Sequence, residues 1–323
     1  MTLLVVGGAG YIGSHMVKAL HAAGLETLTL DNLSNGFRDA VQYGEFVQGD
    51  LADRVFLQSL FERQSFEGVF HFASSILVGE SVRDPAAYYR NNVVNTLNLL
   101  DVMRTFDVDK LVFSSTAAVY GEPESVPITE GHPVLPISPY GKSKAMVESI
   151  LADYQRAYGL RHVRLRYFNA AGADAEGKLG ERHEPETHLI PLVLQAASGR
   201  RDAVTVFGRD YRTEDGTCIR DYVHVEDLCS AHLLAWEYLC SGGEPRAFNL
   251  GNGRGFSVQQ VIRTAQQVTG RPIRVLDGER REGDPDVLVA DSHDARQVLH
   301  WNPQRGELEQ IIGDAWRWEQ HRP

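Results

Sequence analysis

The sequence predicts an α/β fold, in which a doubly wound parallel sheet is followed by a smaller α/β domain. Short apolar segments alternate with helix-length segments through the first half of the chain. The first of them, Leu3–Val6, is apolar on both faces, as a strand buried in a parallel sheet should be. A glycine-rich turn follows this strand directly, which is typical of doubly wound sheets.

The elements of the first half follow from this alternation. The expected strands are Leu3–Val6, Glu26–Leu30, Glu45–Val47, Gly68–Phe72, Lys110–Phe113 and Val163–Tyr167. The expected helices are about Tyr11–Ala23, Arg54–Gln64, Ala86–Phe106 and Pro139–Tyr158. Sheets of this kind bind ligands beyond the carboxyl ends of their strands.

The pattern becomes less regular after about Asn169. The expected loops are Gly172–His188, Arg209–Gly216 and Asp277–Asp286. The expected helices are about Glu226–Leu239, Val258–Thr269, Asp294–Leu299 and Leu308–Glu319. We therefore expect one domain at residues 1–169 and a second at 170–323, with the segment from about 222 to 251 as a candidate to rejoin the first sheet.

Composition argues against several classes of protein. The formal net charge of -11 disfavours nucleic acid as the main partner, because phosphate backbones need clustered lysine and arginine. No apolar stretch approaches the roughly 18 residues that span a membrane, and the N-terminus does not resemble a signal peptide. Cys218, Cys229 and Cys240 contain no C-x-x-C pair, and His183 and His224 have no neighbours at metal-ligand spacing. We expect a cytoplasmic protein without a metal site.

The glycine-rich turn indicates a dinucleotide site. Glycines at 7, 10 and 13 of the run Gly7–Gly13 allow a tight turn, a close approach to a pyrophosphate and close packing of helix on sheet, as in Rossmann-type domains. Asp31 ends the second strand, 18 residues after Gly13. A carboxylate there binds ribose hydroxyls and repels a 2′-phosphate, which favours NAD over NADP. The alternatives are a glycine turn without a ligand, and a helix cap or solvated turn at Asp31.

A tyrosine and a lysine indicate the chemistry. Tyr140 and Lys144 are four residues apart in an expected helix, so they share one face. A nearby ammonium favours the phenolate, which can then act as a base towards a hydroxyl. Thr116 ends a strand upstream and can orient the same hydroxyl. The pair alone also fits a surface tyrosine beside a solvated lysine; the threonine and the glycine turn favour a catalytic site.

Over essentially its whole length, the chain resembles the extended short-chain dehydrogenase/reductase family and, within it, the UDP-glucose (UDP-galactose) 4-epimerases. The first half carries GGAGYIGSH (Gly7–His15), DNLSN (Asp31–Asn35), VGESVRDP (Val78–Pro85), SSTAAVYG (Ser114–Gly121), SPYGKSKAMVE (Ser138–Glu148) and RYFN (Arg166–Asn169). The second half carries TEDGTCIRDYVHVEDL (Thr213–Leu228) and RREGD (Arg280–Asp284). These two later motifs separate the epimerases from other members of the family.

The resemblance implies NAD as cofactor, a UDP-sugar as substrate and a homodimer formed through helices near 88–106 and the helix of Tyr140. The implied cofactor residues are Gly7, Gly10, Tyr11, Ile12, Gly13, Asp31, Asn32, Asn35, Asp50, Leu51, Phe72, Ala73, Asn91, Ser114, Tyr140, Lys144 and Phe168. The implied substrate residues are Thr116, Asn169, His188, Leu189, Phe207, Arg220, Tyr222, Arg281, Asp284 and Leu288. Thr116, Tyr140 and Lys144 are the implied catalytic residues.

The sequence departs from the family pattern at four positions. Ile76 stands where some relatives carry a lysine, and His188 stands where asparagine is common but still offers a donor for a phosphate. Thr116 replaces a common serine and keeps the hydroxyl. Leu288 stands where a tyrosine often borders the sugar pocket, which leaves the choice of hexose open.

The function that the resemblance implies is reversible 4-epimerisation of UDP-galactose and UDP-glucose, by transient oxidation at C4 with NAD kept bound. The nearest alternative enzyme is a nucleotide-sugar dehydratase or an epimerase of another sugar. A 4,6-dehydratase needs a further acid and base beside the active hydroxyl, and Ala117 and Ala118 supply neither. A cofactor-sensing protein without catalysis is the alternative of another class, but such a protein would not need Tyr140 and Lys144.

Overall fold

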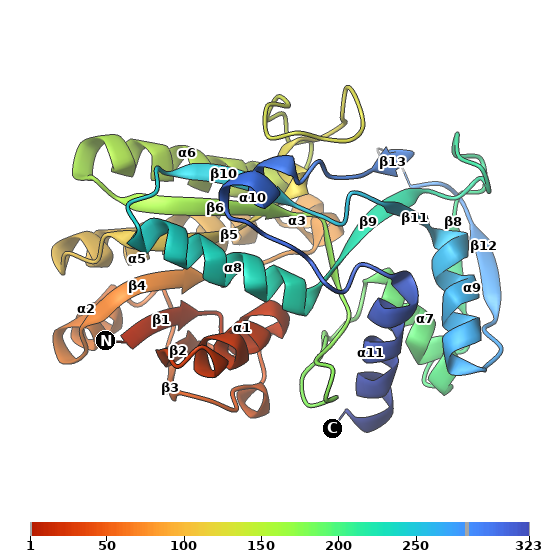
Figure 1. Cartoon of the computed structure of the whole chain (residues 1–323), viewed down its shortest axis with the longest axis horizontal. Coiled ribbons are helices and arrows are strands. Elements are labelled where there is room, and N and C mark those ends of the chain that lie inside the picture. Colours follow the sequence, from red (N-terminus) through yellow and green to blue (C-terminus); the bar gives the residue numbers. More distant parts are fainter. Residues whose placement is uncertain (1, 282–283, 323) are drawn as a thin grey trace. The chain divides into compact units, whose positions relative to one another are not determined.

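The chain forms two compact units in a computed structural model that describes residues 2–281 and 284–322 (Figure 1). The first unit consists of Met1–Gly121, Pro133–Arg166 and Cys229–Phe248. The second consists of Glu122–His132, Tyr167–Leu228 and Asn249–Pro323. No helix among the described residues is long and apolar enough to cross a membrane.

The first unit is built on a seven-stranded sheet in the order β10-β6-β5-β4-β1-β2-β3. Its strands are β1 (Thr2–Val6), β2 (Glu26–Asp31), β3 (Glu45–Gln48), β4 (Phe66–His71), β5 (Lys110–Thr116), β6 (Arg161–Tyr167) and β10 (Arg246–Leu250). The pairings of β1 with β2 and β4, of β2 with β3 and of β4 with β5 are parallel. The strand order reverses between β1 and β4, which is where doubly wound sheets bind their ligands. The predicted fold class is confirmed.

Helices cover both faces of this sheet. They are α1 (Tyr11–Ala22), η1 (Arg38–Ala40), α2 (Arg54–Arg63), α3 (Val78–Arg83), α4 (Pro85–Tyr88), η2 (Tyr89–Val94), α5 (Asn95–Thr105), η3 (Ala117–Val119), α6 (Pro139–Tyr158) and the larger part of α8 (Val225–Cys240). Leu57 of α2, Leu99 of α5 and Val147 of α6 are fully buried in one apolar core with the strands. On α8, the Trp236 ring lies 5.9 Å from that of Phe70 in β4.

The single helix predicted over Ala86–Phe106 is wrong in detail. The segment is divided into α4, a π-helical turn η2 and α5. Within η2, the Asn92 amide donates to the Ser75 carbonyl (3.0 Å) and to the Ser143 hydroxyl of α6 (3.0 Å), and its oxygen accepts from the Ser75 amide (2.8 Å). A π-turn inserts one residue into a helix and often marks a functional site. Here it directs Asn92 between the end of β4 and α6.

The second unit contains a four-stranded sheet and a strand pair. β9 (Ile219–His224) is central and pairs with β7 (Asn169–Ala171), β11 (Gly255–Ser257) and β13 (Val287–Leu288), while β8 (Val204–Phe207) pairs with β12 (Val275–Gly278). Its helices are α7 (Leu189–Ser198), α9 (Val258–Thr269), α10 (His293–Val298) and α11 (Leu308–His321). Figure 1 shows α7, α9 and α11 side by side, and their apolar faces share one core. The loop predicted at Asp277–Asp286 begins within β12, and positions 282–283 lie outside the described residues.

A buried ion pair ties α6 to the sheet of the first unit. The Glu148 carboxylate of α6 accepts hydrogen bonds from the Arg166 guanidinium of β6 (2.9 Å from Nε) and from the Ser115 hydroxyl of β5 (2.6 Å). Arg166 also donates to the Tyr120 hydroxyl (2.9 Å). Glu148 is 4% exposed and Arg166 5%. Burial alone would raise the pKa of Glu148, but the bonds from Arg166 and Ser115 lower it, so the carboxylate is charged.

We predict that Glu148→Gln strongly destabilises the protein. The change leaves the buried Arg166 charge without its counter-charge, which typically costs about 3–5 kcal/mol. Urea unfolding should show this loss. The matched control is Asp153→Asn on the same helix, which breaks an exposed pair with Arg156 and should cost less than about 1 kcal/mol. Equal losses in the two variants would contradict the structural role of Glu148.

Candidate active site

The turn between β1 and α1 depends on glycines. Gly7 has a φ of +79°, and a Cβ there would lie 2.5 Å from the Ala73 amide nitrogen. A Cβ at Gly13 would lie 2.1 Å from the Gly7 carbonyl oxygen, so α1 can approach the strand this closely only without a side chain. Gly10 precedes α1 and offers no side-chain cap. The amide groups of the first turn, which includes Tyr11 and Ile12, can therefore bind an anion.

Asp31 links the end of β2 to this turn. Its carboxylate accepts hydrogen bonds from the Ala9 amide (3.0 Å) and the Leu33 amide (2.8 Å). Burial to 8% exposure raises the pKa of the carboxyl, and these two bonds oppose that effect. The alternative that Asp31 caps a helix does not hold, since the next helical turn, η1, is preceded by Phe37. Asp31 is a fixed acceptor beside the glycine turn.

The loops that follow β2 and β3 meet beside Asp31. The Asn32 amide donates to the Asp50 carboxylate (2.8 Å). Leu51 is buried, and its carbonyl accepts from Asn98 of α5 (3.0 Å). Asn35 is exposed in the loop after β2. The structure thus brings together Asn32 and Asp50, two of the residues expected to bind the adenosine half of the cofactor.

The segment that follows β4 and the helical turn η2 supply further expected cofactor residues. The Phe72 and Ala73 amides both donate to the Val6 carbonyl, at 2.8 and 3.2 Å, which places them directly beside the end of β1. The Asn91 amide of η2 donates to the Ser75 hydroxyl (3.2 Å) in the segment that follows β4. These contacts converge on the reversal point of the strand order.

A close approach of two backbones places Tyr140 beside Thr116. Ser138 caps α6 by accepting from the Gly141 amide (3.1 Å). A Cβ at Gly141 would lie 2.4 Å from the Ala118 carbonyl oxygen, so only glycine lets α6 start against the turn that follows β5. Burial raises the pKa of the Tyr140 phenol, whereas a hydrogen bond with Thr116 lowers it.

Lys144 lies one helical turn further along α6 and is almost fully buried. Its ammonium donates to the Ser74 hydroxyl and to the Ser114 carbonyl, both at 2.7 Å. Burial lowers the pKa of Lys144 to about 7, although the Glu148 carboxylate opposes this shift. The sequence predicts that the ammonium favours the Tyr140 phenolate. In the structure, Thr116 is the side chain that lowers the pKa of the phenol.

In the second unit, four expected substrate residues share one face of a sheet. Arg220 and Tyr222 are two residues apart on β9 and therefore point the same way. Asn169 of β7 pairs with Tyr222, and Leu288 of β13 pairs with Arg220. Directly paired residues lie on the same face, so side chains from three strands converge there. Phe168, expected to contact the cofactor, lies between β6 and β7, where its amide donates to the Leu250 carbonyl (3.1 Å).

The charged residues expected to bind the substrate in this unit already have contacts in the structure. Arg220 forms an ion pair with Asp284, which also accepts from the Tyr211 hydroxyl (3.0 Å). The Arg281 guanidinium lies 4.2 Å from the centre of the Phe207 ring. Tyr211 is a contact that the sequence interpretation missed. The one feature of the sequence that could have indicated Tyr211 is that it lies just before the TEDGTCIRDYVHVEDL motif.

His188 lies in a cluster of four titratable side chains that the sequence does not predict. It precedes α7, and its Nδ1 lies 2.8 Å from Glu181 and 3.2 Å from Glu186. His183 contacts the same two carboxylates, so the expectation that His183 has no neighbours at metal-ligand spacing is wrong. Burial alone would lower the pKa values of both imidazoles. The two carboxylates have the larger, opposite effect and raise the pKa to about 9 for His183 and about 10 for His188. Leu189 begins α7 directly after this cluster.

We predict that the buried Lys144 makes the free energy of unfolding of the cofactor-free protein increase as the pH rises from 7 to 10. Its pKa is about 7 in the folded chain against 10.5 when exposed, so between these values the unfolded state binds more protons and stability rises with pH. Below pH 7 the full cost of burying the ammonium remains. The free energy of unfolding, relative to that of Lys144→Met, should rise on the order of 1 kcal/mol per pH unit from 7 to 10. Exposed Lys142→Met is the control, and parallel curves for wild type and Lys144→Met would contradict the shift.

Comparisons with known proteins identify the family of the chain. Residues 3–251 match the model of the NAD dependent epimerase/dehydratase family. The UDP-glucose 4-epimerase of Halalkalibacterium halodurans is 51% identical over 323 residues, which cover 100% of this chain and 97% of that protein.

Solved structures give the same result. The UDP-glucose 4-epimerase from Brucella ovis in complex with NAD is 50% identical with a TM-score of 0.96, covering 98% of this chain and 97% of that one. The UDP-Glc/GlcNAc 4-epimerase from Campylobacter jejuni is 44% identical with a TM-score of 0.87, covering 99% of both. The family resemblance inferred from the sequence is confirmed. The chain belongs to the NAD dependent epimerase/dehydratase family.

Proposed function

We propose that the chain is an NAD-dependent UDP-hexose 4-epimerase that interconverts UDP-galactose and UDP-glucose. The observation that carries the proposal is the placement of Thr116, Tyr140 and Lys144 at the end of β5 and the start of α6. This placement lies in the unit with the glycine turn, whose free helix N-terminus suits a pyrophosphate. The relatives at about 50% identity are named UDP-glucose 4-epimerase.

In this reaction the first unit holds and deprotonates the sugar hydroxyl. The glycine turn and Asp31 would hold NAD, which would supply a reversible hydride acceptor for C4 of the sugar. Thr116 orients the C4 hydroxyl, and the Tyr140 oxygen takes its proton and later gives it back. The hydrogen bond between Thr116 and Tyr140 favours the phenolate against the effect of burial. Lys144 is held by hydrogen bonds to the Ser74 hydroxyl and the Ser114 carbonyl.

We assign the UDP part of the substrate to the second unit. Arg220 and Arg281 would hold the diphosphate by charge-assisted hydrogen bonds, and Asp284 the uridine ribose. Asn169, Tyr222, Leu288, Phe207, His188 and Leu189 would complete the site. In domain terms, residues 1–169 would bind the cofactor and 170–323 the substrate, with the segment from about 222 to 251 rejoining the first sheet.

Two alternatives have less support. A 4,6-dehydratase would need a further acid and base beside Thr116, where η3 supplies Ala117 and Ala118. A cofactor-sensing protein would not need a lysine buried to 1% exposure and bonded to two groups beside Tyr140.

We also propose a cytoplasmic homodimer. Val94 of η2 and Met146 of α6 are large apolar side chains that are 49% and 45% exposed, and a second copy of the chain would cover them. Cys218, Cys229 and Cys240 carry thiols outside any disulfide, which suits a reducing compartment. Light scattering that gives the mass of one chain would contradict the dimer.

We predict that the purified protein converts UDP-galactose into UDP-glucose without added NAD, because a closed redox cycle needs a retained cofactor. Tyr140→Phe should lower the rate by roughly 10²–10⁴-fold while NAD released on denaturation stays the same, since the base is lost and the ring remains. Tyr158→Phe at the exposed end of the same helix is the control. A Tyr140→Phe enzyme of nearly normal rate, or turnover only with NADP, would overturn the proposal.

Leu288 should influence which sugars are accepted. Leucine lacks the ring and hydroxyl of a tyrosine, so we expect UDP-galactose to be preferred, with weaker activity on UDP-N-acetylgalactosamine. An unpaired buried amide costs roughly 1–3 kcal/mol, which explains why the acetylated sugar should be disfavoured but not excluded. Leu288→Tyr should reduce kcat/KM selectively for the acetylated sugar. An equal effect on both sugars would remove Leu288 from the sugar pocket.

A further inference from the structure

Two histidines and two glutamates of the second unit bring one potential metal-ligand atom each close together. The four contacts between an imidazole Nδ1 and a carboxylate oxygen are 2.8 and 3.2 Å for His188 and 3.3 and 3.6 Å for His183. All four ligand atoms lie within 4.8 Å of one another. We propose that these residues form a binding site for one divalent transition-metal ion, with Zn²⁺ as its probe: Glu181, His183, Glu186 and His188.

The distances fit a tetrahedral ion. Ligand atoms at about 2.0–2.2 Å from Zn²⁺ lie roughly 3.3–3.5 Å from one another in a tetrahedron. The four contacts between a histidine and a glutamate span 2.8 to 3.6 Å, and no two of the four ligand atoms are more than 4.8 Å apart. An ion would therefore need to draw the widest pairs together to roughly 3.5 Å. Imidazole and carboxylate are both ordinary zinc ligands. Two carboxylates also balance the charge of a divalent ion, so the buried site would be neutral.

A second observation shows that hydrogen bonds do not fully account for the cluster. The Glu186 side chain is 4% exposed, and its Oε2 has no hydrogen-bond partner although it lies 3.6 Å from the His183 Nδ1. That Nδ1 is likewise buried without a hydrogen bond. A buried polar atom without a partner is costly, and an unrecorded ion is one explanation for such a pair. Both atoms belong to the group of four ligand atoms that lie within 4.8 Å of one another.

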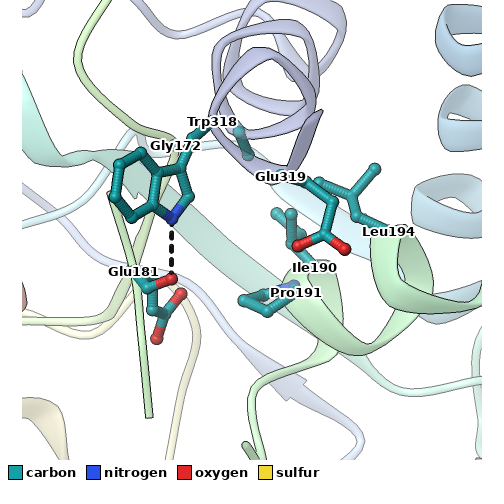
Figure 2. Close-up of a pocket in the computed structure, with 8 residues that line it drawn as sticks. Gly172, Glu181, Ile190, Pro191, Leu194, Trp318 and Glu319 are labelled. Atoms are coloured by element: carbon teal, nitrogen blue, oxygen red, sulfur yellow. Dashed lines mark hydrogen bonds between the residues drawn. The ribbon is translucent and has the colours of Figure 1, made fainter. Parts of the chain in front are cut away.

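The surrounding backbone holds the ligands in place. The other Glu186 oxygen accepts from the Thr187 amide (2.8 Å) and the His188 amide (2.9 Å). The Glu181 carbonyl accepts from the Trp318 indole of α11 (3.0 Å), and Figure 2 shows the Glu181 carboxylate directed away from that ring. Such outer contacts orient the ligands of metal sites. The ion would fix the loop after β7 to the start of α7, where the proposed function puts His188 and Leu189.

Calorimetry on untagged, EDTA-treated and dialysed protein tests the site with Zn²⁺ at pH 8, where protons compete less for the imidazoles. We expect one Zn²⁺ per chain. His183→Ala and Glu186→Gln should each weaken binding by at least about 100-fold, since loss of a direct ligand exceeds the 10–100-fold effect of an outer contact. Zn²⁺ should also raise the melting temperature of the wild type but not of His183→Ala.

Two variants control for other ligands. His293→Ala removes an exposed histidine, and Cys240→Ser removes the exposed thiol; both should bind Zn²⁺ like the wild type. Circular dichroism checks that every variant is folded. Absence of binding, or binding lost in Cys240→Ser and kept in His183→Ala, would overturn the site and leave a histidine–glutamate ion-pair network. These measurements need no turnover, so an inactive protein that binds Zn²⁺ through the cluster would refute only the proposed reaction.

Discussion

The proposed catalytic site in the first unit depends on the buried carboxylate of Glu148. It bonds to β5 through Ser115 and to β6 through Arg166, so α6 cannot turn about its axis without breaking a buried ion pair. Lys144 lies one helical repeat before Glu148, and Tyr140 lies one repeat before Lys144, so all three share a face. Ser115 precedes Thr116 on the same strand. The charge pair therefore sets the position of Thr116 against Tyr140.

Burial then determines the protonation of the site. It raises the pKa of the Tyr140 phenol and lowers that of the Lys144 ammonium, so both effects favour the uncharged forms. Thr116 and Glu148 each oppose the effect of burial at one of these groups. Neither opposing contact is enough to restore the ordinary value. The ionisation needed for proton transfer is consequently sensitive to whatever charge enters the site, which suits a pair that must act only when its ligands are bound.

The sequence predicted what depends on local periodicity and missed what depends on distant contacts. The bounds of α6 and α9 match the expected helices, because proline, serine and apolar spacing mark them locally. The strands of the second unit are two to six residues long and exist through pairing with remote segments, so no local pattern reveals them. The π-turn η2 likewise depends on Asn92 reaching Ser75 and Ser143.

The site residues divide in the same way. The glycine turn, Asp31, Tyr140 and Lys144 stand out in sequence because their spacing has a direct chemical meaning. Glu148 was open to the same reasoning, since it follows Lys144 at a helical repeat, but its partner Arg166 lies on another element. The cluster around His183 has no regular spacing because it lies in a loop. Its members meet only when that loop folds back on itself before α7.

The charges of the second unit determine what kind of ligand it can select. The chain carries a formal net charge of -11, so a diphosphate must be attracted by local cations rather than by the overall field. Arg220 is already paired with Asp284, and a ligand that takes one of them deprives the other of its counter-charge, although Asp284 keeps its hydrogen bond from Tyr211. A ligand with a diphosphate alone would take Arg220 and leave the Asp284 carboxylate without its counter-charge. A ligand with a nucleoside alone would take Asp284 and leave the Arg220 guanidinium without its counter-charge. Because an unpaired, partly buried charge is costly, the pair favours a ligand that offers an anion to Arg220 and hydroxyls to Asp284 at once.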